Sequence, residues 1–185
     1  MSEERVLLLT ESTRWGDMAR DLLTVAGAGV EHVPWSWGES RAELDTAMTA
    51  WRGDYVICFK ADCIVPKATL ASSRVAINFH PGPPWLRGVA CPERAVKRGD
   101  LSYGVTCHHM IEEVDAGKIV VIDTFEVPPC GTVAALRERV GLSMLSQLER
   151  VWLSRHTLAE PGDARDPIWA SELLSVRRAR REGLL

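Results

Sequence analysis

A carboxamide and an imidazole lie two residues apart in this chain, at Asn78 and His80, where the apolar run 75–77 ends. Because residues i and i+2 of a strand point to the same face, both side chains should lie on one side of a strand end. A carboxylate follows at Asp115. An amide can stabilise a developing oxyanion, an imidazole can transfer a proton near neutral pH, and a carboxylate can orient that imidazole. The three side chains together suit the attack of an amine on a carbonyl, in which the amine loses a proton.

The same residues also have a purely structural interpretation. An Asn-x-His pair at a strand end often arises without a catalytic role, and Asp115 stands in an Asp-Ala-Gly sequence of the kind that hairpin turns use. Taken alone, the three residues leave both interpretations open.

Short apolar runs alternate along the chain with segments of helical periodicity, which indicates an α/β fold. Strands that alternate with helices pair in parallel through right-handed crossovers, and so predict an open sheet with both faces covered. A hairpin at its edge makes the sheet mixed. The expected strands cover residues 5–10, 30–33, 55–59, 75–79, 103–110 and 118–125, and the expected helices cover 17–26, 40–51, 92–98 and 132–156.

Two further expectations concern the start of one helix and the C-terminal segment. Ser40 and Glu43 have the spacing of a capping box, which would open the helix that runs to about Trp51. The last segment, 168–185, is expected to be helical. We therefore expect a catalytic domain over 1–160 and a C-terminal helical tail over 161–185 that packs on the same domain.

The composition is that of a globular protein of one domain, with 185 residues, 46% hydrophobic and 25% charged. A net charge of −3 implies no general attraction to nucleic acid. Five scattered cysteines without a CxxC pair suit a reducing compartment. Neither a signal peptide nor an apolar stretch long enough for a bilayer is evident, so we expect a cytoplasmic protein with no membrane partner.

Four blocks of sequence, in order, resemble the formyltransferases that take their one-carbon unit from 10-formyltetrahydrofolate. Residues 63–67 (CIVPK) are similar to the ILPK element of that family, 77–81 (INFHP) to its INxHP element, and 86–88 (LRG) to its YRG element. Residues 104–106 (GVT), followed by 114–119 (VDAGKI), are similar to GVT…DxGxI. The resemblance implies the formyltransferase fold, a single Rossmann-like domain with a mostly parallel open sheet flanked by helices.

The resemblance also implies roles for individual residues. Asn78 and His80 would hold the formyl oxygen, and Asp115 would position His80 and a water that relays protons. The pterin end of the folate would lie between the loops 61–65 and 110–115. The candidate contacts of this cofactor are Cys63, Ile64, Val65, Met110 and Glu112, and those of the acceptor are Gly82, Arg87 and His108.

Departures from the family pattern reduce the number of acceptor classes that we expect. Residues 10–16 lack the glycines with which a phosphate-binding loop approaches its ligand, so a purine precursor is not expected. No basic domain follows the Asp115 loop, so we expect no tRNA. The remaining acceptors are small-molecule amines: an amino sugar, an amino acid or a hydroxylamine. Two alternatives stay open, a 10-formyltetrahydrofolate hydrolase that releases formate and a non-catalytic folate-binding protein.

Two further expectations concern metals and assembly. Cys107, His108 and His109 are adjacent on an expected strand, where neighbouring side chains point to opposite faces, so we expect no metal site. The long helix over 132–156 could belong to the core or to the interface of a homodimer.

Overall fold

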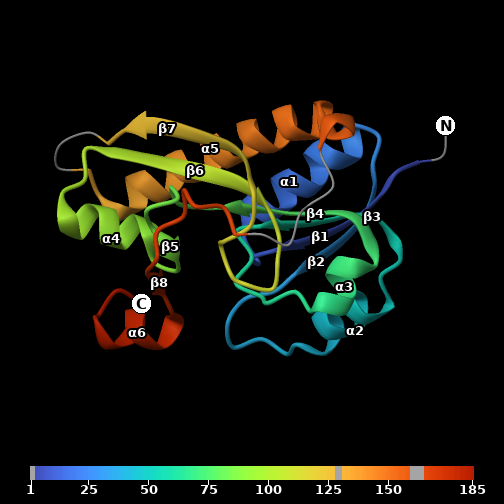
Figure 1. Cartoon of the computed structure of the whole chain (residues 1–185), viewed down its shortest axis with the longest axis horizontal. Helices are drawn as coiled ribbons and strands as arrows, with labels where there is room; N and C mark the ends of the chain where they lie inside the picture. Colours follow the sequence, from blue (N-terminus) through green and yellow to red (C-terminus); the bar gives the residue numbers. More distant parts are fainter. Residues whose placement is uncertain (1–2, 128–130, 159–164) are drawn as a thin grey trace.

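The computed structural model describes residues 3–127, 131–158 and 165–185. A six-stranded sheet with the order β2-β1-β3-β4-β6-β7 runs through the molecule, with helices on both faces (Figure 1). Strands β2, β1, β3 and β4 are parallel, whereas β6 is antiparallel to both β4 and β7. The strands are β1 (Arg5–Thr10), β2 (Gly29–Pro34), β3 (Gly53–Phe59), β4 (Ser73–His80), β6 (Ser102–His109) and β7 (Ile119–Glu126).

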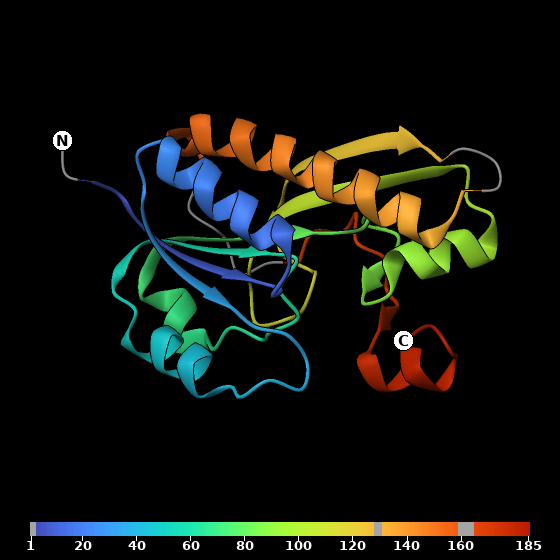
Figure 2. The same cartoon turned by 180° about the vertical axis from the view of Figure 1, so that it is seen from behind.

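The helices form two layers around the sheet. Helices α1 (Arg14–Val25) and α5 (Val133–Leu153) pack side by side on one face (Figure 2). Helices α2 (Ala42–Ala50) and α3 (Lys67–Ala71) cover the other face, and α4 (Cys91–Arg98) lies beside the first turns of α5. This arrangement confirms the predicted α/β fold.

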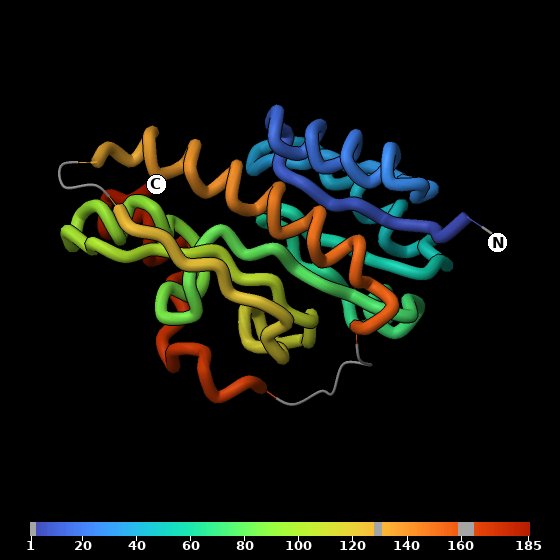
Figure 3. Tube along the Cα trace, turned by 90° about the horizontal axis from the view of Figure 1, so that it is seen from above, coloured from blue at the N-terminus to red at the C-terminus, as the bar shows by residue number. Residues whose placement is uncertain are grey.

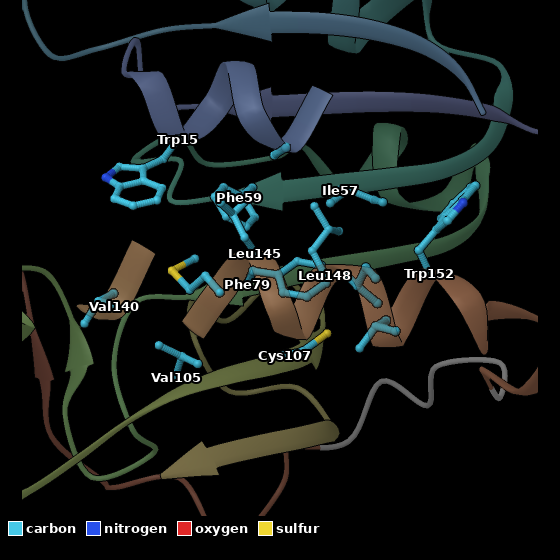
Figure 4. Close-up of a cluster of buried hydrophobic side chains, with 14 of the residues drawn as sticks. Trp15, Ile57, Phe59, Phe79, Val105, Cys107, Val140, Leu145, Leu148 and Trp152 are labelled. Carbon is cyan, nitrogen blue, oxygen red and sulfur yellow. The ribbon is translucent and has the colours of Figure 1, made fainter. Parts of the chain in front are cut away.

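The apolar core lies mainly between the sheet and the helices α1 and α5. The central strands contain continuous buried apolar runs, as is typical of strands that are covered on both faces. Helix α5 supplies buried residues at steps of three and four, and they pack against β3, β4 and β6 (Figure 4). Gly141 lets α1 come close, because a Cβ at this position would lie 2.3 Å from the indole of Trp15. A smaller apolar cluster fills the space under α2.

Two of the differences between the predicted and the observed helices concern α2 and α3. The capping box was wrong: α2 begins at Ala42 after Arg41, and the Ser40 hydroxyl accepts a hydrogen bond from the Ala42 N–H at 3.3 Å. The five-residue helix α3 after Pro66 was not predicted, because it is too short to show periodicity.

The C-terminal segment is largely not helical. Within residues 165–185, the structure has a short strand, β8 (Leu173–Leu174), and one helix, α6 (Val176–Arg181). Strand β8 pairs in parallel with β5 (Arg87–Gly88), far away in sequence. Figure 3 shows this segment in red, passing beside the loop that joins β6 to β7 and ending near α4. The helical prediction for 161–185 was therefore wrong for most of the described residues, whereas the division into a domain and a tail stays a prediction.

Candidate active site

The carboxyl end of β4 places Asn78 next to a histidine of the neighbouring strand. In the antiparallel register of β4 and β6, Asn78 is directly opposite His108, so the two side chains lie on the same face. The Asn78 Nδ2 atom is 3.1 Å from His108 Nε2. His80, two residues along β4, lies opposite Thr106 and is also buried. Asn78 and His80 were predicted to lie on the same face of a strand, and His108 lies on that face of the sheet as well.

Asp115 lies at the centre of these three side chains. Its Oδ1 atom is 3.3 Å from Asn78 Nδ2 and 3.5 Å from His108 Nε2. Its Oδ2 atom is 3.4 Å from His80 Nδ1 and accepts a hydrogen bond from the Gly88 N–H at 2.9 Å. We refer to Asn78, His80, His108 and Asp115 as the Asp115 cluster.

The protein partners of the two histidines define their neutral tautomers. A carbonyl oxygen can only accept, so His80 Nε2 donates to the Leu86 carbonyl at 3.0 Å. For the same reason, His108 Nδ1 donates to the His109 carbonyl at 2.8 Å. The ring nitrogens that face Asp115 are therefore the unprotonated ones. Either imidazole, on taking up a proton, would form an ion pair with the carboxylate.

The pKa values of His80 and Asp115 are both lowered, for different reasons. Burial lowers the pKa of His80, although Asp115 opposes this shift. Burial alone would raise the pKa of Asp115, but the positive charge of a protonated His80 or His108 and the hydrogen bond from the Gly88 N–H lower it. The bonds from Gly88 and Asn78 do not depend on the charge of His80. We therefore take Asp115 as ionised and His80 as neutral at pH 7.

The backbone of the Asp115 turn is held in an uncommon conformation. Asp115 has φ = 45°, in the left-handed region that Asp and Asn tolerate better than most residues. The buried guanidinium of Arg87 stabilises this turn by donating to the carbonyls of Asp115 and Val114, both at 2.7 Å. It also donates to the Glu113 carboxylate at 2.8 Å and to the Ala170 carbonyl at 3.0 Å.

A cavity of about 800 Å³ opens beside the Asp115 cluster, and all four members of the cluster line it. The side chain of Ile64 is 60% exposed at this cavity, which is unusual for a large apolar residue and suits contact with a flat ring. The five residues predicted to contact the folate all line the cavity: Cys63, Ile64, Val65, Met110 and Glu112. Their role stays a prediction.

Two residues that we assigned to the acceptor lie elsewhere. Arg87 has its guanidinium bound to the protein, and neither it nor Gly82 lines the cavity. Gly82 allows close packing instead, because a Cβ there would lie 2.8 Å from His80 Nε2 and 2.9 Å from Cys91 Sγ. The geometry therefore gives no support to their contact with an acceptor. His108, the third residue of that set, lies in the Asp115 cluster.

Several residues of the site had no recognisable signal in the sequence. Gly88 was only part of a motif, yet its N–H binds the Asp115 carboxylate. The C-terminal segment forms another part of the cavity wall, and Trp169 of this segment contacts both imidazoles. The residues that the segment contributes to the wall are Leu173, Leu174, Ser175, Val176, Arg180 and Leu185.

Metal ions and membranes are two other possible partners of such a chain. Within 3–127, 131–158 and 165–185, no three His, Cys, Asp or Glu side chains are arranged to hold a metal ion. None of the helices in these ranges combines the length and the apolar character that a bilayer crossing requires.

The chain is similar to known proteins in both sequence and structure. The sequence model of the formyl transferase family matches residues 6–150. A methionyl-tRNA formyltransferase of Treponema pallidum is 35% identical over 118 residues, which is 61% of this chain and 37% of that protein. This chain thus spans little more than a third of the length of that relative.

Solved structures agree on the fold. A sugar N-formyltransferase from Shewanella has a TM-score of 0.72 at 18% identity, covering 96% of this chain and 79% of the other. HypX from Aquifex aeolicus in complex with tetrahydrofolic acid has a TM-score of 0.73 at 20% identity, covering 94% of this chain and 29% of the other. At such identities the likeness concerns the fold, but the family match covers more than half of the chain and includes Asn78, His80 and Asp115. The chain therefore belongs to the formyl transferase family.

Proposed function

We propose that this protein is an N-formyltransferase, which transfers the formyl group of 10-formyltetrahydrofolate to the amine of a small molecule. The observation that carries the proposal is the Asp115 cluster. An ionised carboxylate lies between an amide and two imidazoles at the wall of a cavity large enough for a ligand of that size. We propose a cytoplasmic location and leave the homodimer as a prediction.

The cavity wall on the α3 side supports binding of the folate donor. Ile64, Val65 and Met110 provide apolar surface in the wall of the cavity that Asn78 also lines. An ion pair between Lys67, the first residue of α3, and Glu112 connects this helix to the loop after β6. This combination of apolar walls with a few polar groups at the edge suits a pterin ring. The folate supplies the activated formyl group.

The Asp115 cluster can accept the proton that the amine must lose. The lone pairs of His108 Nε2 and His80 Nδ1 both face the carboxylate, so a proton arriving at either nitrogen is stabilised by ion pairing. Asn78 is the most accessible member of the cluster and can turn one N–H from His108 or Asp115 toward an oxyanion. His80 is buried and its Nε2 is bound to the Leu86 carbonyl, so we propose that it acts through Asp115.

The end of β1 supports a small acceptor rather than one held by a phosphate loop. Two N–H groups of this segment already have partners within the protein. Ser12 donates to the Ser36 hydroxyl at 3.1 Å, and Thr13 donates to the Glu11 carbonyl at 2.8 Å. They are therefore not available to a phosphate in this conformation. We propose an amino sugar, an amino acid or a hydroxylamine as the acceptor.

A direct assay tests the proposal. The protein is incubated with 10-formyltetrahydrofolate and a panel of amino sugars, amino acids and hydroxylamines, and products are identified by mass spectrometry. We expect one amine class to gain a formyl group while tetrahydrofolate forms in equal amount. Rapid release of formate without any amine would contradict transfer, and the Asp115→Asn variant serves as the inactive control. Folate binding without either reaction would indicate a non-catalytic protein.

A further inference from the structure

We propose that Trp169 is a positioning residue of this active site, which holds the imidazoles of His80 and His108 with their free nitrogens toward Asp115. This inference rests on the proposed function, because it assigns the C-terminal segment a part in the same reaction. Trp169 belongs to none of the four sequence blocks that indicated the family.

The indole of Trp169 contacts both rings. Its centroid is 4.9 Å from that of His108, with an angle of 78° between the planes. The corresponding values for His80 are 5.8 Å and 72°. These are edge-to-face arrangements, which aromatic pairs prefer over stacked faces. Trp169 is only 3% exposed, so it also excludes water from this side of the two imidazoles.

The position of Trp169 is determined by hydrogen bonds to the Asp115 loop. The indole N–H donates to the Gly117 carbonyl at 2.8 Å, two residues after Asp115. Just before it, the Asp166 N–H donates to the Ala116 carbonyl at 2.9 Å, and the Asp166 carboxylate accepts from the Ile119 N–H at 3.1 Å. The segment and the loop are thus attached to each other on both sides of Gly117.

The chain after Trp169 is attached to the β4–α4 region. The Ala170 N–H donates to the Pro84 carbonyl at 3.0 Å, and its carbonyl accepts from Arg87 at the same distance. Strand β8 then pairs with β5. A side chain held by backbone bonds on both flanks has little freedom, so the indole can restrict the rotation of the imidazoles.

Loss of the indole would change the solvation of the His80 ring. The ring has Asp115 3.4 Å from Nδ1 and the Cys91 Sγ atom 3.7 Å from Nε2, and the charges of His108 and Arg94 also act on it. With Trp169 removed, water can reach the ring, and the burial that lowers the pKa of His80 is relieved. The His80 pKa should then rise, and the imidazole should rotate more freely.

The experiment compares Trp169→Phe and Trp169→Ala with Trp152→Phe. Trp152 is a matched control, because it is 2% exposed and contacts the Tyr55 ring edge-on at 5.2 Å, away from the Asp115 cluster. Imidazole pKa values are measured by NMR in protein labelled with ¹³C-histidine, without substrates. His80→Gln and His108→Gln assign the signals, and His32 is an internal reference.

We expect Trp169→Ala to raise the pKa of His80 and Trp152→Phe to leave it unchanged. In the transfer assay, Trp169→Phe should lower kcat about tenfold with little change in KM for the folate, because misplaced catalytic groups lower the rate rather than the affinity. Unchanged imidazole titration together with an unchanged kcat would overturn the inference. If Trp169→Ala does not fold, Trp169→Phe keeps both measurements possible. Undiminished turnover of Asp115→Asn would instead contradict the proposed function, and the NMR titration would still test the place of Trp169.

Discussion

The candidate active site is formed by two regions whose conformations are stabilised in different ways. The first comprises the ends of β4 and β6 and the loop to β7, where sheet pairing places Asn78 opposite His108. The second, 165–185, has little regular structure of its own and is held by hydrogen bonds to the first. A segment without a motif can therefore determine the surroundings of side chains that a motif identifies.

The largest expected effect comes from removing the residue that joins the two regions. Arg87→Met would remove the donor that Arg87 provides to the buried carbonyl of Asp115 and to the carbonyl of Val114, and one of the two guanidinium donors to the Ala170 carbonyl. We expect the free energy of unfolding to fall by at least ~3 kcal/mol, since unpaired buried polar groups are costly. Urea denaturation measures this change. Arg177→Met, on the exposed side of α6, should change stability little, and equal losses in the two variants would show that Arg87 does not link the regions.

Asp115→Asn tests the first region by itself. The amide keeps the shape of the carboxylate and tolerates the left-handed backbone, so folding should be preserved. The variant loses the negative charge that stabilises a protonated imidazole, and turnover should fall by at least ~10²-fold. Single-turnover kinetics with saturating folate measure the change. A rate like that of the wild type would remove Asp115 from the mechanism.

Ala90→Gly is expected to have a smaller effect in the opposite direction. Ala90 precedes α4 with φ = 56°, a conformation that costs alanine free energy and glycine little. The substitution should raise the free energy of unfolding by up to about 1 kcal/mol. The gain is limited because glycine also increases the conformational entropy of the unfolded chain, which favours unfolding. Ala50→Gly, at the last residue of α2, is the control and should be destabilising by less than about 1 kcal/mol. Destabilisation by both changes would mean that Ala90 is not strained.

The smallest expected effect is the contribution of His80 to the pH dependence of stability. The pKa of His80 is lowered in the folded protein, so the unfolded chain binds more protons as the pH falls below the usual histidine value. Stability should therefore be present at neutral pH and decline on acidification below about pH 6.5. His32 and His109 act in the same direction, because burial also lowers their pKa values. Urea denaturation at a series of pH values measures this dependence. In His80→Gln, the free energy of unfolding should fall less steeply on acidification than in the wild type. An unchanged pH dependence would argue that His80 is charged when folded.

Much of the first region could be predicted from residue types and spacing. The run 75–77 and the polar residues after it predicted the end of β4, and its bounds, Ser73–His80, confirm that strand. The hairpin with Asp115 in its loop was likewise confirmed as β6 and β7. These features depend on local periodicity and turn chemistry, which a sequence displays directly.

The second region could not be predicted in the same way. The segment 165–185 contains residues compatible with a helix, but its partners are β5, the Asp115 loop and Pro84, all at least 40 positions away. Tertiary hydrogen bonds outweigh weak helical propensity over such a length. For a similar reason Arg87, expected at the acceptor, is instead bound to backbone carbonyls inside the protein.

The sequence by itself determined the α/β fold, the family and the three polar residues Asn78, His80 and Asp115, because periodicity and short motifs are local properties. Only the tertiary structure showed that His108 joins them through the register of β4 and β6, and that Trp169 closes the site from the C-terminal segment. Register and long-range hydrogen bonds arise when distant segments meet, and their free energies depend on both partners at once.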